Sequence, residues 1–270
     1  MRIPFIKMHG VGNDFIIINQ KDLENDIKAS SLATAVCHRH FGIGADGLMI
    51  AEESKIADAR MLYYNSDGSQ GELCGNGLRC FAHYINRLDP TGKTELKVET
   101  LAGIKQMKIA AEDPLTSSVT VEMGTPQIKA LEARIELNGH EYIYSYLMMG
   151  VPHVVIFTDR PSPKLVDSIG PLIEKHPYFE HGTNVNFCTI QDRSRISVLT
   201  WERGAGHTLG CGTGVSSVCA AAYQLDKTNP QIQVETEGGF LEIIVKEDDS
   251  IVMTGPARQI CTGEYDYVSV

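Results

Sequence analysis

The chain has 270 residues, 43% hydrophobic and 21% charged, a composition typical of a globular protein with a sizeable core. Its formal net charge of −10 at pH 7 argues against a nucleic-acid partner held by phosphate contacts. No apolar run approaches the ~18 residues of a membrane span, and the opening stretch MRIPFIKMHG has no apolar signal region. We therefore expect a cytoplasmic protein without membrane attachment.

The first half of the chain alternates between strand-like and helix-like patterns. The stretch GLRCFAHYINRL has apolar residues at helical spacing, and the expected strands are short runs of strand-like composition. In chain order we expect strands at 3–8 and 14–19, a helix at 30–40, strands at 48–53 and 59–65, a helix at 77–88, and strands between 95 and 123.

The second half has a similar order of patterns. The expected elements are a strand and turn within 146–157, a helix near 165–175, strands at 183–190 and 195–202, a helix at 214–225, and strands to about 253. In each half, a strand that ends in polar residues leads through a short loop to Cys-Gly-x-Gly and a helix. We therefore expect two similar α+β halves with a boundary near 112–118.

Two motifs in the first half resemble binding sites but have ordinary explanations. The sequence CHRH at 37–40 is the nearest approach to a metal cluster, but its spacing matches no zinc pattern, and we interpret it as the end of a helix. Gly42, Gly44 and Gly47 spell the dinucleotide fingerprint G-x-G-x-x-G. That motif requires a strand before it and a helix after it, whereas the expected order here is reversed, which indicates a tight turn. We expect neither a metal nor a nucleotide cofactor.

Two cysteines, Cys74 and Cys211, stand directly before glycine at expected helix starts. The first N–H groups of a helix lack intrahelical partners and carry a partial positive charge, which attracts anions and favours a thiolate. Glycine lets a carboxylate approach those N–H groups closely. One such site could be a peroxidase or transferase cysteine or a buried helix cap. Two copies in matching context favour a shared function.

Two activated thiols suggest inversion of a carbon centre. If both helix starts bind one carboxylate, its α-carbon lies between two sulfurs. One thiolate then removes the α-proton, and the opposite thiol returns a proton to the other face. The helix starts stabilise the charge that builds on the carboxylate, so no cofactor is required.

Five motifs together resemble the diaminopimelate epimerase family, whose members act without a cofactor in lysine and peptidoglycan-precursor synthesis. The resemblance covers nearly the whole chain. The motifs are KMHGVGNDF (7–15), NSDGSQGELCGNGLRC (65–80), GVPH (150–153), TNVNF (183–187) and WERGAGHTLGCGTG (201–214).

The resemblance assigns roles to individual positions. It implies that Cys74 and Cys211 are the catalytic acid–bases and that His153 supports the site. It also implies that four helix-start residues hold the reacting carboxylate and that five side chains bind the rest of the substrate. The helix-start residues are Gly75, Asn76, Gly212 and Thr213, and the side chains are Asn13, Asn65, Asn184, Glu202 and Arg203. An arginine is well suited to hold a carboxylate, and Glu202 can accept from an ammonium group.

The resemblance also implies an architecture. The expected fold has two pseudo-symmetric α+β halves, each a curved mixed sheet around a central helix, with the active site in the cleft between them. The expected halves are 1–118 with a returning strand at 259–270, and 119–258. A homodimer and a small amino-acid substrate are expected.

Three positions depart from the family pattern. Val151 stands where many members have Asn, His207 where Glu is usual, and Gly47 where some members have Gln. None is a thiol or a helix-start residue, so the departures bear on the distal end of the substrate. A racemase of another amino acid, such as histidine, therefore remains as the nearest alternative. A thiol peroxidase or disulfide oxidoreductase would leave Glu202 and Arg203 unexplained, and a non-catalytic anion-binding module would need no thiol at either helix.

Overall fold

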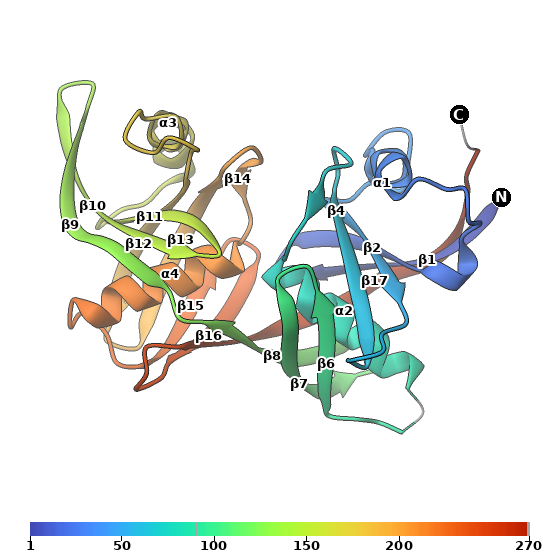
Figure 1. Cartoon of the computed structure of the whole chain (residues 1–270). Coiled ribbons are helices and arrows are strands. Elements are labelled where there is room, and N and C mark those ends of the chain that lie inside the picture. The colour runs from blue at the N-terminus through green and yellow to red at the C-terminus, as the bar shows by residue number, and fades with distance from the viewer. Residues whose placement is uncertain (90, 269–270) are drawn as a thin grey trace. The chain divides into compact units, whose positions relative to one another are not determined.

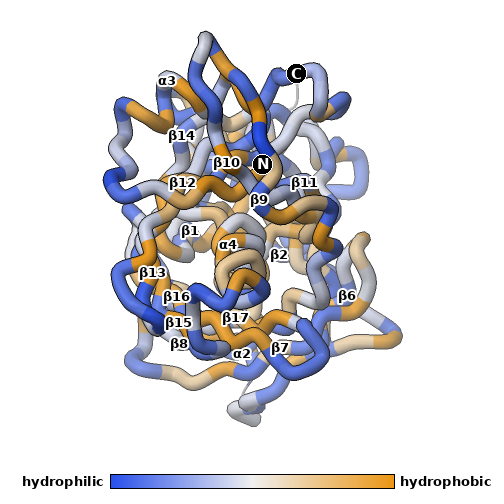
Figure 2. Tube along the Cα trace, turned by 90° about the vertical axis from the view of Figure 1, so that its left-hand side faces the viewer, coloured by the Kyte–Doolittle hydropathy of each residue, from blue (hydrophilic) through white to orange (hydrophobic). Residues whose placement is uncertain are grey.

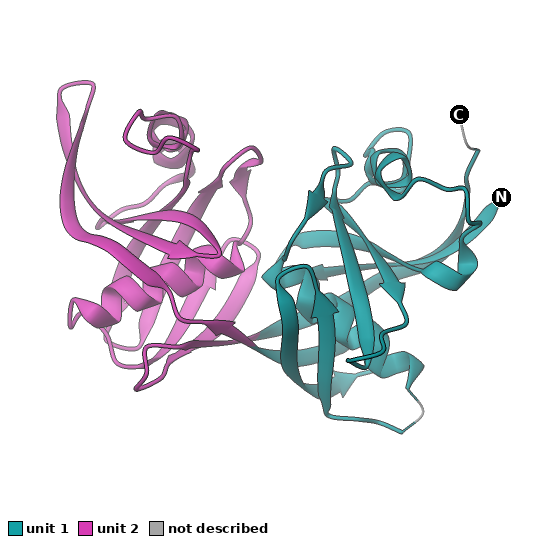
Figure 3. Ribbon diagram, in the orientation of Figure 1, with its two compact units in different colours: residues 1–121, 255–270 teal, residues 122–254 magenta. Residues whose placement is uncertain are grey.

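Two compact units make up the computed structural model, which describes residues 1–89 and 91–268. Unit 1 comprises Met1–Val121 and the chain from Gly255 onward, and unit 2 comprises Glu122–Thr254 (Figure 3). Two strands, β8 (Thr116–Gly124) and β17 (Ile251–Asp266), contain residues of both units. The chain therefore passes from one unit to the other twice.

Unit 1 contains two α-helices, a short 3-10 helix and strands from both ends of the chain (Figure 1). Its helices are η1 (Gln20–Asp22), α1 (Ala29–Cys37) and α2 (Gly75–Leu88). Its strands besides β8 and β17 are β1 (Arg2–Gly10), β2 (Asn13–Asn19), β3 (Gly47–Glu52), β4 (Ala59–Asn65), β5 (Gln70–Gly71), β6 (Glu95–Thr100) and β7 (Gly103–Asp113).

Unit 2 has the same kinds of element in a similar order. Its helices are α3 (Pro163–Glu174) and α4 (Gly212–Gln224). Its strands besides β8 and β17 are β9 (Gln127–Leu137), β10 (His140–Met149), β11 (Val151–Phe157), β12 (Asn184–Asp192), β13 (Arg195–Glu202), β14 (Gly206–Thr208), β15 (Gln231–Thr236) and β16 (Gly239–Val245).

Strand pairing follows one plan in both units. The pair β1–β2 is antiparallel, β2–β3 parallel, β3–β4 antiparallel and β4–β6 parallel. The corresponding pairs β10–β11, β11–β12, β12–β13 and β13–β15 have the same four orientations. This repetition confirms the expectation of two pseudo-symmetric α+β halves.

Each unit wraps its strands around one central helix. The helix α2 packs against β1, β2, β3 and β7, and α4 packs against β10, β11, β12 and β16. Ten residues of α4 are buried, and they are Gly, Ala, Val, Ser and Cys, whose small side chains let strands approach on several sides. Figure 2 shows α4 in pale to orange colours along much of its length, as expected for a helix without a solvent-facing polar side.

The first helix ends earlier than the sequence pattern predicts. It stops at Cys37 instead of residue 40, because His38 Nδ1 accepts the N–H groups of His40 and Phe41 at 3.2 and 3.1 Å and starts a turn. The interpretation of CHRH as a helix end is therefore confirmed.

The glycines of G-x-G-x-x-G lie between α1 and β3, in the reverse of the dinucleotide-binding order. A Cβ added at Gly42 would lie 2.1 Å from the Ala35 carbonyl oxygen, and Gly44 has φ +80°. These glycines allow a tight helix-to-strand connection, as the sequence indicates.

Candidate active site

Cys74 is the N-cap residue of α2, with extended backbone angles (φ −134°, ψ 117°). The next three residues, Gly75, Asn76 and Gly77, open the helix and are buried. A Cβ at Gly77 would lie 2.5 Å from Met49 Cε, so the glycine lets the helix start lie directly against β3. The prediction that a helix starts at Cys74 is confirmed. The N–H groups of the first turn of α2 can bind an anion.

Asn13 connects the Cys74 thiol to a carboxylate. The thiol of Cys74 donates to Asn13 Oδ1 at 3.6 Å, and Asn76 Nδ2 donates to the same oxygen at 3.3 Å. Asn13 Nδ2 in turn donates to Asp46 Oδ2 at 2.7 Å. The β1–β2 turn that presents Asn13 includes Val11 at φ 48°, a costly conformation for a β-branched residue.

Arg79 lies fully buried behind this half-site. Its Nη2 donates to Asn76 Oδ1 at 2.9 Å and its Nε to the Pro256 carbonyl at 3.2 Å. Burial lowers the pKa of Arg79 to about 10, so the guanidinium keeps its charge at neutral pH. A Cβ at Gly10 would lie 2.9 Å from Arg79 Nη2, so β1 leaves room for the guanidinium only because residue 10 is glycine.

Asn65, at the end of β4, is held within its own turn. Its Oδ1 accepts from the Tyr63 hydroxyl at 2.8 Å, and its Nδ2 donates to Ser69 Oγ at 2.9 Å. These contacts fix the orientation of the amide.

Cys211 is the N-cap residue of α4 and repeats the position of Cys74. The Gly214 N–H donates to Cys211 Sγ at 3.4 Å, and the Thr213 hydroxyl lies 3.3 Å from the same sulfur. A Cβ at Gly214 would lie 2.3 Å from Asn186 Oδ1, so this helix start also lies directly against a strand, here β12. The second helix-start prediction is confirmed.

Asn184 fixes the loop that carries Glu202 and Arg203. Asn184 Oδ1 accepts the Arg203 N–H at 2.9 Å, and its Nδ2 donates to the Pro152 carbonyl at 2.9 Å. The Arg203 guanidinium donates to the His181 carbonyl at 2.8 Å, and Glu202 accepts from the Thr208 hydroxyl at 2.6 Å. The structure therefore brings Asn184, Glu202 and Arg203 together in unit 2.

Glu174, a residue that the sequence analysis missed, anchors the same loop from the end of α3. Its two oxygens accept from Trp201 Nε1 at 2.6 Å and from the Gly204 N–H at 3.0 Å. Nothing in the local pattern of α3 distinguishes Glu174 from a solvated helix residue. Asp46 and Arg79 were missed as well, although Arg79 lies within the quoted motif CGNGLRC.

His153 is fully buried on β11. Burial, with a smaller effect of Arg203, lowers the pKa of His153 to about 3, so the ring is neutral at physiological pH. Its Nδ1 lies 3.4 Å from Asn186 Nδ2, which requires Nδ1 to accept and Nε2 to carry the proton. In the described part of the chain, no hydrogen-bond partner lies at Nε2.

The other buried cysteines have poorly stabilised thiolates. Burial raises the pKa of Cys37 and Cys80 to about 12, and it raises the pKa of Cys188 and Cys219 well above the ordinary value. These four side chains serve as small core residues.

The three departures from the family pattern have distinct surroundings. Val151 opens β11 and is 36% exposed. His207 lies between two carboxylates, with Nδ1 3.0 Å from Asp167 and Nε2 2.6 Å from Glu237. At Gly47, an added Cβ would lie 2.6 Å from Tyr63, which accounts for glycine at that position.

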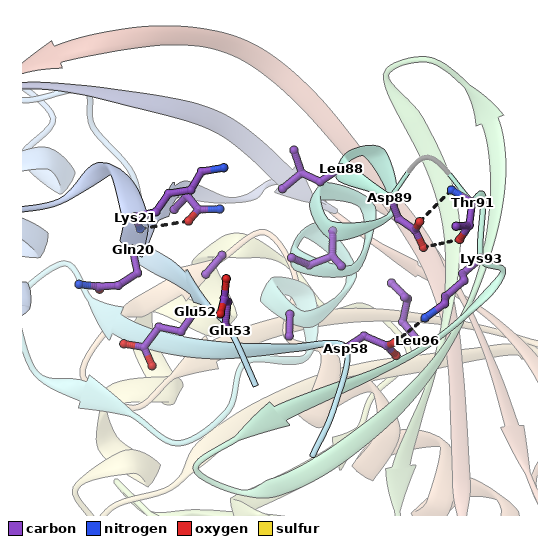
Figure 4. Close-up of a pocket in the computed structure, with 14 residues that line it drawn as sticks. Gln20, Lys21, Glu52, Glu53, Asp58, Leu88, Asp89, Thr91, Lys93 and Leu96 are labelled. Carbon is purple, nitrogen blue, oxygen red and sulfur yellow. Dashed lines mark hydrogen bonds and ion pairs between the residues drawn. The ribbon is translucent and has the colours of Figure 1, made fainter. Parts of the chain in front are cut away.

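A pocket of about 700 Å³ opens in unit 1 between η1, β3, the end of α2 and β6 (Figure 4). Its lining includes four acidic residues, Glu52, Glu53, Asp58 and Asp89, and the ion pair of Asp58 with Lys93 at 2.8 Å. It contains none of the residues assigned to the active site.

Among residues 1–89 and 91–268, no group of three or more His, Cys, Asp or Glu side chains could hold a metal ion. No helix in the same ranges has the length and hydropathy needed to cross a membrane.

Comparison with known proteins gives one consistent family. The family described as Diaminopimelate epimerase matches residues 5–129 and 145–260. The chain is 45% identical to the diaminopimelate epimerase of Alkaliphilus metalliredigens, covering 98% of each chain. It is 39% identical to that of Caldanaerobacter subterraneus subsp. tengcongensis, covering 97% of this chain and 99% of the relative.

Solved structures with the same fold include two from Agrobacterium. A hydroxyproline epimerase from Agrobacterium vitis has a TM-score of 0.71 at 15% identity, covering 98% of this chain and 92% of its own. A probable proline racemase from Agrobacterium radiobacter has a TM-score of 0.72 at 16% identity, covering 99% and 93%. These two support the fold of two pseudo-symmetric halves.

Proposed function

The chain belongs to the diaminopimelate epimerase family and is an isomerase, and from that premise we propose that it interconverts L,L- and meso-2,6-diaminopimelate through Cys74 and Cys211. The reaction would supply lysine and peptidoglycan-precursor synthesis in the cytoplasm. The observation that carries the proposal is the repeated half-site, in which a thiol caps a buried helix whose first residues include two glycines.

Each helix start supplies N–H groups to the reacting carboxylate. Gly75 and Asn76 open α2, and Gly212 and Thr213 open α4. As the α-proton leaves, negative charge moves onto the carboxylate, and the N–H groups and helix dipoles stabilise it. The barrier falls because this stabilisation is stronger in the transition state than in the ground state.

Proton transfer requires one thiolate and one thiol. The thiolate takes the α-proton, and the electron pair of the C–H bond moves onto the α-carbon and its carboxylate. The opposite thiol then donates its proton to the other face. The centre is inverted, and the two sulfurs have exchanged protonation states.

The distal end of the substrate carries an ammonium and a second carboxylate. We propose that Arg203 binds the carboxylate, since its guanidinium is always charged and can form two parallel hydrogen bonds. Glu202 accepts from the ammonium, while Asn13, Asn65 and Asn184 complete the binding groups. His153 is neutral and buried, which supports a packing role.

We also propose that the protein forms a homodimer. Two large apolar side chains of unit 1 are exposed, Ile260 of β17 at 51% and Leu88 at the end of α2 at 54%. Light scattering on the purified protein tests this assignment, and a monomeric mass at micromolar concentration contradicts it.

The deciding experiment uses the purified protein in heavy water without added cofactor. L,L-diaminopimelate should give the meso isomer with deuterium at the inverted α-carbon, detected by mass spectrometry and NMR. Histidine, glutamate and lysine, each lacking part of the distal end, should exchange far more slowly. Preferred exchange of histidine would replace the epimerase assignment with a racemase of that amino acid.

A further inference from the structure

One hairpin of unit 2 carries both charged side chains that we assign to the distal end of the substrate. Strands β13 and β14 pair antiparallel to form this β13–β14 hairpin (residues 200–208), with Trp201 directly opposite His207. Glu202 ends β13, and Arg203 begins the loop between the two strands. The position of the hairpin therefore decides where both charged side chains lie.

The helix α3 packs against both strands of the hairpin. A Cβ added at Gly170 of α3 would lie 2.6 Å from Trp201 Cγ, so the helix approaches β13 closely because residue 170 is glycine. Glu174 at the end of α3 accepts from Trp201 Nε1 at 2.6 Å. Opposite residues on paired strands have their side chains on the same face, so His207 lies on the face of the hairpin that α3 covers.

The His207 ring contacts two acidic side chains from different elements. Its Nδ1 lies 3.0 Å from Asp167 Oδ1 on α3, and its Nε2 lies 2.6 Å from Glu237 Oε2 in the turn between β15 and β16. Carboxylate oxygens only accept hydrogen bonds, so a ring that donates at both nitrogens carries two protons and a positive charge. A neutral ring has one N–H and can donate to only one of the two carboxylates. The charged ring therefore joins the helix, the hairpin and the turn.

The two contacts of the ring differ in exposure. The side chain of His207 is 20% exposed, that of Glu237 31% and that of Asp167 58%. Water screens an exposed ion pair, and holding exposed side chains in place costs conformational entropy. The shorter and less exposed contact with Glu237 should therefore contribute more to the bridge than the contact with Asp167.

The residues that follow His207 connect it to the site. The Thr208 hydroxyl, next along the chain, donates to Glu202 Oε1 at 2.6 Å. The N–H of Gly238, in the same β15–β16 turn, donates to the Leu209 carbonyl at 2.8 Å. A movement of β14 away from this turn would therefore also move the hydroxyl that orients the Glu202 carboxylate.

The tip of the hairpin has anchors of its own. Asn184 Oδ1 accepts the Arg203 N–H at 2.9 Å, and Glu174 accepts the Gly204 N–H at 3.0 Å. These contacts hold the backbone of the loop, whereas His207 holds the second strand. Loss of the His207 bridge should therefore loosen the hairpin without unfolding unit 2.

We infer that His207 is a positioning residue: it ties the β13–β14 hairpin to α3 and to the β15–β16 turn, and so places Glu202 and Arg203 for the distal end of the substrate. The inference rests on the proposed function for the identity of that substrate. Distal groups do not react, so contacts with them stabilise the ground state and the transition state alike. The bridge therefore acts on KM and on the preference for a substrate with a charged distal end.

Hydrogen exchange of the substrate-free protein, read by mass spectrometry, tests the bridge itself. His207→Leu removes both donors, and peptides covering 202–209 and 236–240 should then exchange roughly five- to tenfold faster. A peptide covering 215–224 in α4 should not change. His140→Leu is the matched control, because it makes the same substitution at an exposed position at the start of β10.

Four further variants separate hydrogen bonding from packing. His207→Gln places an N–H close to the position of Nε2, so it can keep the contact with Glu237 and should exchange nearly as slowly as the unmodified protein. Glu237→Ala leaves the ring in place and should match His207→Leu, whereas Asp167→Ala should have a smaller effect. His207→Glu brings a third carboxylate to the other two and should exchange fastest, since like charges repel.

Kinetics of the same variants test the consequence for the substrate. His207→Leu should raise KM for L,L-diaminopimelate roughly tenfold and change kcat by less than about twofold. The α-deuterium exchange of L-2-aminohexanoate, which has no charged distal group, should stay within about twofold of the unmodified protein. Partial unfolding would slow both substrates alike, so the ratio of the two separates positioning from stability.

Three results would overturn the inference. The first is equal exchange of the hairpin peptides in His207→Leu and His140→Leu, and the second is a His207→Glu protein as well protected as the unmodified one. The third is a lower kcat with unchanged KM, which would place the effect of His207 at the reacting centre. Glu237→Ala gives the same decision if His207→Leu does not fold. Hydrogen exchange uses no substrate, so absence of epimerisation by the unmodified protein would refute the proposed function while the hairpin peptides still decide the bridge.

Discussion

Among single residues, Cys74 and Cys211 differ from the four core cysteines because each occupies the N-cap of a helix. Cys74→Ala and Cys211→Ala should each lower kcat for epimerisation by about 10³-fold or more, because each removes the acid–base on one face. The assay is conversion of L,L-diaminopimelate by purified protein with unchanged circular dichroism.

Cys261→Ser is the control for the thiol variants, since Cys261 is exposed on β17. It should retain full activity. Normal turnover by either capping variant would rule out the two-base mechanism.

Arg203 should set the preference for a second carboxylate. Arg203→Met should reduce kcat/KM for L,L-diaminopimelate. The corresponding loss of transition-state stabilisation should be about 2–5 kcal/mol, as expected for truncation of a charge pair. Arg193→Met, which removes an exposed arginine paired with Asp226 in the same unit, is the matched control. Equal losses in both variants would show that Arg203 has no specific role in binding.

His153 should make unit 2 sensitive to acid. Its pKa of about 3 lies below the unfolded value of about 6.5, so the unfolded chain binds a proton first as the pH falls. The stability that neutral His153 contributes is complete above pH ~6.5 and is lost progressively down to the folded pKa. Between pH ~6.5 and ~5 the loss should be about 1–2 kcal/mol.

Urea unfolding at several pH values measures this loss, with His153→Gln as the comparison. The variant should show a shallower decline over the same range. His140→Gln, at an exposed position on β10, should leave the decline unchanged.

At the scale of elements, the two helix starts should tolerate a methyl group differently. At Gly77 the added Cβ meets the flexible end of Met49, which can move. At Gly214 it meets Asn186, whose amide is held by the Val154 carbonyl at 3.0 Å and the Thr200 hydroxyl at 3.2 Å. Gly214→Ala should therefore cost about 1–3 kcal/mol of unfolding free energy, and Gly77→Ala less. Denaturant unfolding gives both values, and the reverse order would contradict this explanation.

The central helices and most strands could be predicted because their patterns are local. The run GVSSVCAAAYQL follows Cys-Gly-x-Gly directly, and the helix begins at Gly212, within two residues of the prediction. Short β14 and the long β9 were not predicted, since β14 has only three residues and β9 is largely exposed, with little alternation of burial. The end of α1 was misplaced because a side-chain contact of His38, invisible in apolar spacing, ends the helix.

At the scale of the whole molecule, unit 1 depends on the far end of the chain. The strand β17 pairs with β1 from Arg2 with Asp266 to His9 with Arg258, and Tyr267 lies in the same core as Ile3. A chain ending at Thr254 should lose the fold of unit 1 while the core around α4 remains.

Hydrogen exchange read by mass spectrometry tests the truncation. Peptides of β1 should lose protection, and peptides of α4 should keep it. Removal of residues 268–270 alone is the control and should change neither. Retained protection of β1 in the long truncation would contradict the dependence.

The capping thiols and the loop of Glu202 and Arg203 could be placed from sequence because their motifs are contiguous. Asp46 and Glu174 could not be assigned, because each acts on residues distant in sequence. Asp46 reaches Asn13 across 33 positions, and Glu174 reaches Trp201 across 27. Such pairings are set by strand register and helix packing, which local patterns do not specify.

The Arg79 guanidinium, which fills the space beside Gly10, constrains how the two units diverged in sequence. Unit 1 combines Gly10 with Arg79, and unit 2 has Met149 and Ser216 at the corresponding positions. A side chain at residue 10 meets the guanidinium at 2.9 Å, so a change at one position alone overfills the space or leaves it empty. Passage between the two arrangements therefore requires paired substitutions, and descent from a duplicated ancestor would leave these positions covarying in relatives.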